Sequence, residues 1–241
     1  MESFASANCF IAKENGALIK QEGACAERRS PASTFKIAIS LMGYNENILA
    51  DETRPELPFK KGYVDHRKNW QQPHNPTNWI KNSCVWYSQI ITKQIGMNKF
   101  KDYIAKFSYG NQNVFGNNAL TESWLSGSLK ISPEEQIKFL EQLLASKLAV
   151  SAKAQEFTRN ILYISDLTDG WKLYGKTGAG SNDKNYKFGW FVGWVEKDMH
   201  KIIFANYVEE KQALDSSMGA QAKELAIGKL RLLISNCQST E

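Results

Sequence analysis

The segments of this sequence that are typical of β-strands lie near its two ends, and this placement limits the possible folds. Near the N-terminus, apolar runs at 9–12 and 17–19 flank Asn15-Gly16, a dipeptide typical of a tight hairpin turn. Three more strand-like runs follow late in the chain, at residues 172–176, 188–195 and 201–208. The short link at 196–199 predicts an antiparallel hairpin from the last two. A mostly antiparallel sheet built from both chain ends, in an α+β fold, fits this order.

Helical patterns lie between these strands, separated by a long loop with short helical turns at 44–76 and a loop-like stretch at 109–130. The clearest helix start is Ser132, because Pro133 follows at the first helical position and Glu135 completes a capping box. Other helices are expected from Ser33 to a stop at Gly43, from Thr77 to Ile95 with a break near Ser83, from Asn98 to Phe107, and from Ser216 to Leu233. We therefore expect one domain over residues 1–241, with a helical region of about 44–165 inserted between the N-terminal elements and the C-terminal strands and helix.

Composition argues against several classes of protein. Mean hydropathy is −0.44 and no apolar run approaches the roughly 18–20 residues of a membrane helix, so no membrane partner is expected. Net charge is +5, from 30 Lys and Arg against 25 Asp and Glu, without a dense basic run, and no nucleic-acid partner is expected. The first residues lack the pattern of a signal peptide, so the chain is expected to be cytosolic or to have lost its leader.

Histidine and cysteine usage argues against a metal centre. The three histidines form no HExxH motif, lie near no GxSxG motif and are expected at the surface, while the four cysteines show no metal-binding spacing. A Ser-His-Asp hydrolase is disfavoured for the same reason. Pairing outward from the Asn15-Gly16 turn places Cys9 opposite Glu22, so a disulfide between Cys9 and Cys25 is not expected.

Ser33-Thr34-Phe35-Lys36 is the first motif that carries chemistry. On a helix, Ser33 and Lys36 share a face, so the hydroxyl and the amine can meet. A serine nucleophile needs a base beside it, and a lysine serves only if burial lowers its pKa or if its chemistry is changed. Alone, the motif also fits a helix cap with a solvated lysine, and a second S-x-x-K copy occurs in the polar stretch 181–184.

Lys176-Thr177-Gly178 is the second such motif, at the end of the strand expected over 172–176. A cation, a hydroxyl and a residue without a side chain on one strand edge suit a substrate carboxylate, because glycine lets a ligand approach the backbone. Alone, this triplet also fits a strand that simply ends in a turn.

The two motifs, taken together and in this order, form a signature of penicillin-recognising serine enzymes. From about residue 8 to 234, the chain resembles the class D (oxacillinase-type) serine β-lactamases. The resemblance rests on motifs in the family's order: Pro31–Lys36, Ser83-Cys84-Val85, Tyr109-Gly110-Asn111, Trp124-Leu125 and Tyr174–Gly178. The S-x-V form at 83–85 favours class D over class A enzymes and most transpeptidases. A β-lactamase-like fold with a helical subdomain is implied.

The resemblance implies a role for each matching residue. Ser33 is implied as the nucleophile that becomes acylated. Lys36 is implied to be carboxylated on its amine by CO2 or bicarbonate, which turns a cation into a carbamate that can act as a base. Trp124 is implied to hold the carbamate through its indole N–H, while Val85 and Leu125 keep the pocket apolar. No metal or other cofactor is implied.

Further roles are implied around this centre. Ser83 is implied to relay a proton to the leaving nitrogen near Lys176, and the backbone N–H groups of Ser33 and Ala179 to form the oxyanion hole. The implied substrate-binding residues are Val85, Leu125, Lys176, Thr177, Gly178 and Ala179. The implied pocket-shaping residues are Phe35, Tyr109, Gly110 and Asn111. Without the other motifs, Trp124 and Val85 would be read as core residues, and residues 109–111 as a turn that ends a helix.

Two segments depart from the family pattern. Many relatives have an arginine for the substrate carboxylate on the helix after the last strand. Residues 216–223 contain none, and Lys223 is the possible anchor there, without the bidentate fork of an arginine. The segment 112–120 is shorter than in some relatives, and because it leads to Trp124 the change could alter the carbamate pocket.

The implied activity is hydrolysis of the amide bond of penicillin- or oxacillin-type β-lactams. The implied partners are therefore small-molecule β-lactams, met in the periplasm by a monomer or homodimer whose signal peptide has been removed. Three alternatives stay open: a β-lactam sensor domain that stays acylated, a peptidoglycan D-Ala-D-Ala peptidase, which Ser83-Cys84-Val85 disfavours, and an inactive relative that no longer retains the carbamate.

Overall fold

A six-stranded antiparallel sheet forms the centre of the computed structural model, which describes residues 8–125, 127–211 and 218–238, with side chains as far as Ser235. The strand order is β2-β1-β6-β5-β4-β3. The strands are β1 (Cys9–Glu14), β2 (Ala17–Gly23), β3 (Tyr163–Asp166), β4 (Lys172–Ser181), β5 (Lys187–Lys197) and β6 (His200–Glu210). The antiparallel sheet from both chain ends is confirmed. The short edge strand β3 was not expected, since four residues carry too little alternation to stand out.

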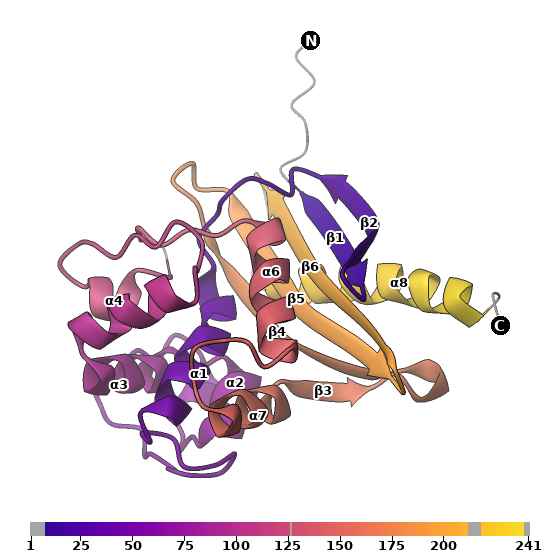
Figure 1. The fold of residues 1–241 in the computed structure, drawn as a ribbon. Helices are drawn as coiled ribbons and strands as arrows, with labels where there is room; N and C mark the ends of the chain where they lie inside the picture. Colours follow the sequence, from indigo (N-terminus) through magenta and orange to yellow (C-terminus); the bar gives the residue numbers. More distant parts are fainter. Residues whose placement is uncertain (1–7, 126, 212–217, 239–241) are drawn as a thin grey trace.

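Helices pack against both faces of this sheet (Figure 1). The helices are α1 (Lys36–Asn45), α2 (Pro76–Asn82), α3 (Val85–Ile95), α4 (Met97–Lys106), α5 (Ala119–Glu122), α6 (Pro133–Leu144), α7 (Ala152–Ile161) and α8 (Met218–Gln238). Three 3₁₀ turns are η1 (Ala32–Phe35), η2 (Lys68–Trp70) and η3 (Thr168–Gly170). In Figure 1, α6 crosses the front of the sheet and α8 lies behind it.

The alternation of side chains along the strands divides the core into two clusters. On β6, Phe204 belongs to the cluster that packs against Ala226 and Leu230 of α8. Its neighbours Ile203 and Ala205 belong to the larger cluster shared with the other helices. Because both faces are covered, the central strands are continuous apolar runs.

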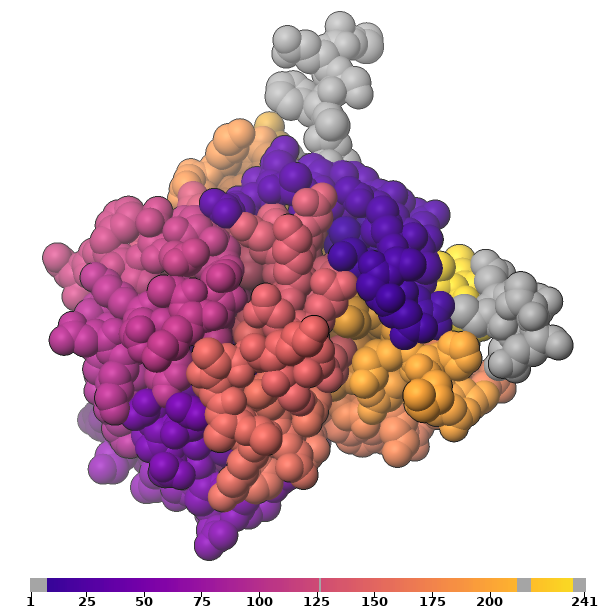
Figure 2. Space-filling model, in the orientation of Figure 1, coloured from indigo at the N-terminus to yellow at the C-terminus, as the bar shows by residue number. Residues whose placement is uncertain are grey.

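Segments from distant parts of the chain meet beside the sheet. Helix α6 starts at Ser132 with the expected capping box, and it contacts β1 and β6. Figure 2 shows the surface of the N-terminal hairpin directly beside that of the segment containing α6, and Lys13 pairs there with Glu141 at 3.3 Å. Within the described residues, no helix combines the length and apolarity that crossing a bilayer requires.

Several expected element boundaries are wrong by a few residues. Helix α1 continues past Gly43 to Asn45. Gly43 does not end the helix; it serves close packing, since an added Cβ would be 3.0 Å from the Leu49 side chain. Strand β4 runs to Ser181, so the Lys176-Thr177-Gly178 motif lies within the strand and not at its end. Ser216 and Ser217, the expected start of the last helix, lie outside the described residues. His74, expected at the surface, is buried.

The expectation against a Cys9–Cys25 disulfide is wrong, since these two cysteines are bonded. A register shift between Ala12 and Lys13 places Cys9 opposite Gly23 and not opposite Glu22. Gly23 has a φ of +78°, and the Ala24 N–H then donates to Asn8 O at 3.0 Å. This turn folds the chain back, so that the Cα atoms of Cys9 and Cys25 are 5.1 Å apart.

We expect the disulfide between Cys9 and Cys25 to raise the free energy of unfolding. Because it closes a loop with a sequence separation of 16, the Cys9→Ala/Cys25→Ala variant should lose about 3 kcal/mol in free energy of unfolding. Urea unfolding of the variant and of the oxidised wild type measures this difference. Reduced wild type is the control and should match the variant, whereas an unchanged midpoint after reduction contradicts the prediction.

Candidate active site

Ser33 and Lys36 meet at the point where the turn η1 passes into helix α1. Pro31 precedes the turn, and the Thr34 hydroxyl donates to Pro31 O at 2.7 Å, which closes it. Lys36 is the first residue of α1, one turn after Ser33. Its Nζ donates to Ser33 Oγ at 3.0 Å. The alternative of a helix cap with a solvated lysine is wrong, because Lys36 is 0% exposed.

The surroundings of Lys36 change the chemistry of its amine. Burial disfavours the charged form and, with the positive charge of Arg67, lowers the pKa of Lys36 to about 7. A large fraction of this amine is therefore neutral near pH 7. A neutral amine has a lone pair that can accept a proton or attack an electrophile, and an ammonium has none.

Trp124 lies against the same turn. Its ring stacks on Phe35 with centroids 5.5 Å apart and is fully buried. Its indole Nε1 has no hydrogen-bond partner among the described residues. The Ser30 hydroxyl lies 2.9 Å from Trp124 O and 3.0 Å from Leu125 O, which ties this segment to the chain just before the nucleophile. An unpaired buried N–H is costly, and here it offers a donor to an added acceptor.

Ser83 and Lys176 form a second pair of hydroxyl and amine. Ser83 lies between α2 and α3 with a φ of +56°, so the expected break in the helix is confirmed. Lys176 Nζ donates to Ser83 Oγ at 2.9 Å and to Thr177 O at 2.9 Å. Burial lowers the pKa of Lys176 well below its ordinary value, and the charges of Lys36, Arg67 and Lys223 act in the same direction. The neutral form of the Lys176 amine is therefore more favoured than that of an exposed lysine.

Gly178 allows β4 to approach the nucleophile turn. A Cβ added at Gly178 would lie 3.0 Å from Pro31 O and 3.2 Å from the backbone N of Thr34. A side chain here would push the strand away from Ser33. The close approach keeps the backbone of residues 177–179 beside the turn that carries Ser33.

A cleft of about 490 Å³ borders the same strand. Its walls include Lys176, Thr177 and Lys223, together with residues of α2 and of the segment that leads into β3. Strand β3 pairs with β4 only as far as Tyr174, so residues beyond Tyr174 face this cleft without a neighbouring strand on that side in the described chain. Burial lowers the pKa of Lys223, which is partly buried.

The turn at Tyr109-Gly110-Asn111 packs against Phe35, which lies next to Lys36 in the chain. The Tyr109 ring packs edge-on against Phe35 at 5.0 Å. Gly110 has a φ of +54°, and an added Cβ would lie 2.0 Å from Lys130 O, so glycine is required there. Asn111 Nδ2 donates to Ser128 O at 2.9 Å. The turn thus joins the end of α4 to the loop that follows Trp124.

The structure joins most of the predicted site residues by direct contacts. Lys36 donates a hydrogen bond to Ser33, and Lys176 donates to both Ser83 and Thr177. Val85 is 8% exposed at the start of α3, and Leu125 packs partly buried against the core. The roles of Val85, Leu125 and Ala179 beside Ser33 stay predictions.

Sequence reasoning missed two features of the site. Gln136 of α6 donates to Thr34 Oγ1 at 2.9 Å and so stabilises the turn that carries Ser33. Arg67 lies close enough to affect the charge of both Lys36 and Lys176. The signal for Gln136 is a buried polar residue on a predicted helix, whereas Arg67 lies in an aperiodic loop and has no signal. In the described chain, no cluster of three or more His, Cys, Asp or Glu could hold a metal ion.

Comparisons with known proteins agree with this geometry. A family model described as the penicillin binding protein transpeptidase domain matches residues 10–228. The chain is 41% identical to β-lactamase OXA-1 of Escherichia coli over 236 residues, covering 95% of this chain and 82% of that protein. It is 37% identical to β-lactamase OXA-9 of Klebsiella pneumoniae over 234 residues, covering 92% and 85%.

A solved structure of a β-lactamase also matches this chain closely. The crystal structure of OXA-427, titled a class D β-lactamase, superposes with a TM-score of 0.89 at 39% sequence identity. The match covers 95% of this chain and 99% of that chain.

The environment of Lys36 predicts an unusual titration. In CO2-free buffer, the Lys36 amine should titrate near pH 7, because its neutral form is favoured by burial, while exposed lysines titrate near ~10.4. Side-chain ¹⁵N NMR of lysine-labelled protein measures this. Lys36→Met serves as the assignment control, and a Lys36 signal that stays protonated to pH 9 contradicts the prediction.

Proposed function

Because this chain belongs to the class D serine β-lactamases, we propose that it hydrolyses penicillin- and oxacillin-type β-lactams through an acyl-enzyme on Ser33. The observation that carries the proposal is the buried Lys36 amine, 3.0 Å from the Ser33 hydroxyl. A base in contact with a hydroxyl is what a serine nucleophile needs.

The residues around Lys36 fit a carboxylated amine. A pKa of about 7 leaves neutral amine available to react with CO2, and the unpaired Trp124 indole N–H is a donor suited to the new oxygen atoms. Trp124 would hold the group, while Val85 and Leu125 keep water away. When present, the carbamate supplies an anionic base for the protons of Ser33 and of the hydrolytic water.

The remaining roles are proton transfer to the leaving group and stabilisation of the oxyanion. Ser83 and Lys176, already hydrogen-bonded, are placed to pass a proton to the β-lactam nitrogen as its bond to the carbonyl carbon breaks. The backbone N–H groups of Ser33 and Ala179 are assigned to the oxyanion, an arrangement supported by the close approach of Gly178 to the turn.

Substrate binding is assigned to the free edge of β4. Lys176, Thr177 and the backbone at Gly178 and Ala179 face the substrate, and Lys223 lines the adjoining cleft. Phe35, with Tyr109, Gly110 and Asn111 below it, shapes the pocket without touching the reacting atoms.

The disulfide bears on where the reaction takes place. Bonds such as Cys9–Cys25 persist in oxidising compartments, which supports action in the periplasm. We further propose that the protein works as a monomer or a homodimer, which size-exclusion chromatography with light scattering distinguishes.

Replacement of the reacting pair should abolish turnover. Ser33→Ala should lower kcat for nitrocefin by at least about 10³-fold, because the bond-forming atom is lost. Lys36→Ala should also lose turnover and should not be rescued by bicarbonate. Wild-type protein in bicarbonate is the reference. One equivalent of product without a steady state would favour the sensor alternative, and release of D-alanine from a model peptide would favour the peptidase.

Trp124→Phe should separate carbamate retention from packing. The ring contact with Phe35 is kept, but the donor is removed, so carbamate occupancy and activity should fall and depend more steeply on added bicarbonate. Carbon-13 NMR in ¹³C-bicarbonate measures the occupancy. In the wild type, it should fall as pH drops below about 7, since protonated amine does not react. An unchanged carbamate signal in Trp124→Phe contradicts the assigned role.

A further inference from the structure

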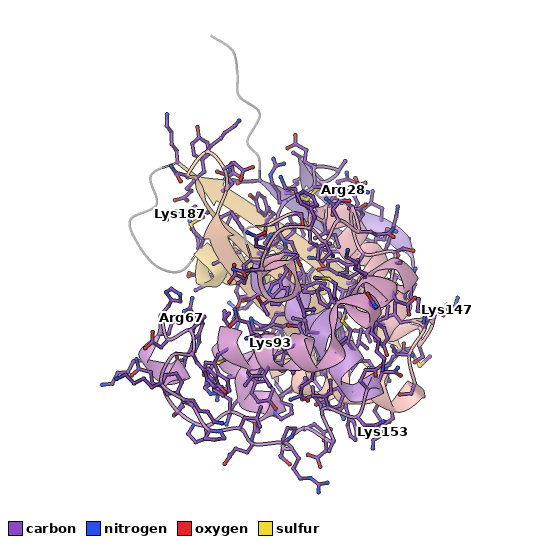
Figure 3. All side chains as sticks on the ribbon, turned by 90° about the vertical axis from the view of Figure 1, so that its left-hand side faces the viewer. Arg28, Arg67, Lys93, Lys147, Lys153 and Lys187 are labelled. Atoms are coloured by element: carbon purple, nitrogen blue, oxygen red, sulfur yellow. A yellow bond between two sulfur atoms is a disulfide. The ribbon has the colours of Figure 1, made fainter. Side chains whose placement is uncertain are left out.

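Arg67, on the loop that precedes α2, is an exposed cation whose charge acts on both buried lysines. In Figure 3, Arg67 is labelled at the left of the molecule, below Lys187 and to the left of Lys93. Its side chain is exposed and forms no ion pair with any described residue. Its charge lowers the pKa of both Lys36 and Lys176, so the guanidinium lies within electrostatic reach of both.

Two contacts connect the Arg67 guanidinium to the segment that carries Ser83, one to Trp70 and one from Trp70 to Asn82. Arg67 Cζ lies 5.8 Å from the centre of the Trp70 ring, a cation–π arrangement. Trp70 is buried, and its Nε1 donates to Asn82 O at 2.9 Å, the carbonyl just before Ser83. The Trp86 Nε1 donates in turn to Trp70 O at 2.9 Å. The platform under Arg67 is therefore bonded to the segment that carries Ser83.

The other cations of the site are poorly suited to hold a carboxylate firmly. Lys176 Nζ already donates to Ser83 Oγ, Thr177 O and Thr177 Oγ1, at 2.9, 2.9 and 3.5 Å, and burial disfavours its charged form. Lys223 is a point charge that lacks the two-pronged geometry of a guanidinium, and burial lowers its pKa as well. A guanidinium stays charged at all working pH values and can grip a carboxylate with two parallel hydrogen bonds.

We propose that Arg67 is the residue that binds the ring carboxylate of the β-lactam, from the loop before α2, in a site whose last helix has no arginine in residues 218–223. This inference rests on the proposed function, because the substrate must lie between Ser83 and Thr177. It assigns the main anchoring role to Arg67 and a lesser one to Lys223.

The test compares a substrate that has the carboxylate with one that lacks its charge. Benzylpenicillin and its methyl ester share the reacting amide. In Arg67→Ala, kcat/KM for benzylpenicillin should fall by about tenfold to a hundredfold, mostly through KM, and kcat/KM for the ester should stay within twofold of the wild type. Arg67→Lys should recover part of the loss, since a lysine keeps the charge without the fork. Lys68 is an exposed cation one residue away. The matched control is therefore Lys68→Ala, which should leave kcat/KM unchanged for both substrates.

Each other outcome overturns the assignment. Equal losses for both substrates would mean that Arg67 acts through the charge of Lys36 and not on the carboxylate. A carboxylate-specific loss in Lys223→Ala, with none in Arg67→Ala, would transfer the anchor to the last helix. Failure of the proposed function looks different, because the wild type would then hydrolyse neither the acid nor the ester.

Discussion

The removal of two lysine amines from water, at 0% and 3% exposure, is the constraint on which the rest of this site depends. A buried ammonium is costly, and both amines respond by favouring the neutral form. Each then hydrogen-bonds a serine hydroxyl, Lys36 with Ser33 and Lys176 with Ser83. Burial thereby favours in both amines the neutral form that the proposed acid–base chemistry uses, whereas an amine in water at pH 7 would hold its proton.

The fold keeps this arrangement dry by covering both faces of one sheet closely. On one face, Gly178 lets β4 touch the turn of Ser33. On the other face, Gly189 of β5 admits the start of α8, where an added Cβ would lie 1.9 Å from Met218 O. The nucleophile turn and α8, which carries Lys223, therefore lie on opposite faces of neighbouring strands. Side chains at either glycine would widen the site and readmit water around the amines.

The sequence allowed the contacts between hydroxyl and amine to be predicted better than the parts that surround them. Ser33 and Lys36 are three residues apart in one motif, and this spacing brings them into contact at the start of a helix. Ser83 and Lys176 stand in two separate motifs of the family pattern. The capping box at Ser132 is a purely local signal. The Cys9–Cys25 bond could not be predicted, because a single register shift in β1 decides which residues face each other. Arg67 could not be predicted either, because its position depends on Trp70 and Asn82, which no periodic pattern connects to the site.

The positive charges around the site explain why it suits anionic ligands. Lys36, Lys176 and Lys223 all have a lowered pKa, and Arg67 brings a charge that cannot be titrated away. Positive groups so close together repel one another, and each anion that enters reduces that repulsion. A carbamate on Lys36 would do so from inside the protein, and a substrate carboxylate at Arg67 would do so from the cleft. Because both anions neutralise the same positive charges, each reduces the attraction that remains for the other, so carboxylation of Lys36 and binding of an anionic β-lactam become linked equilibria.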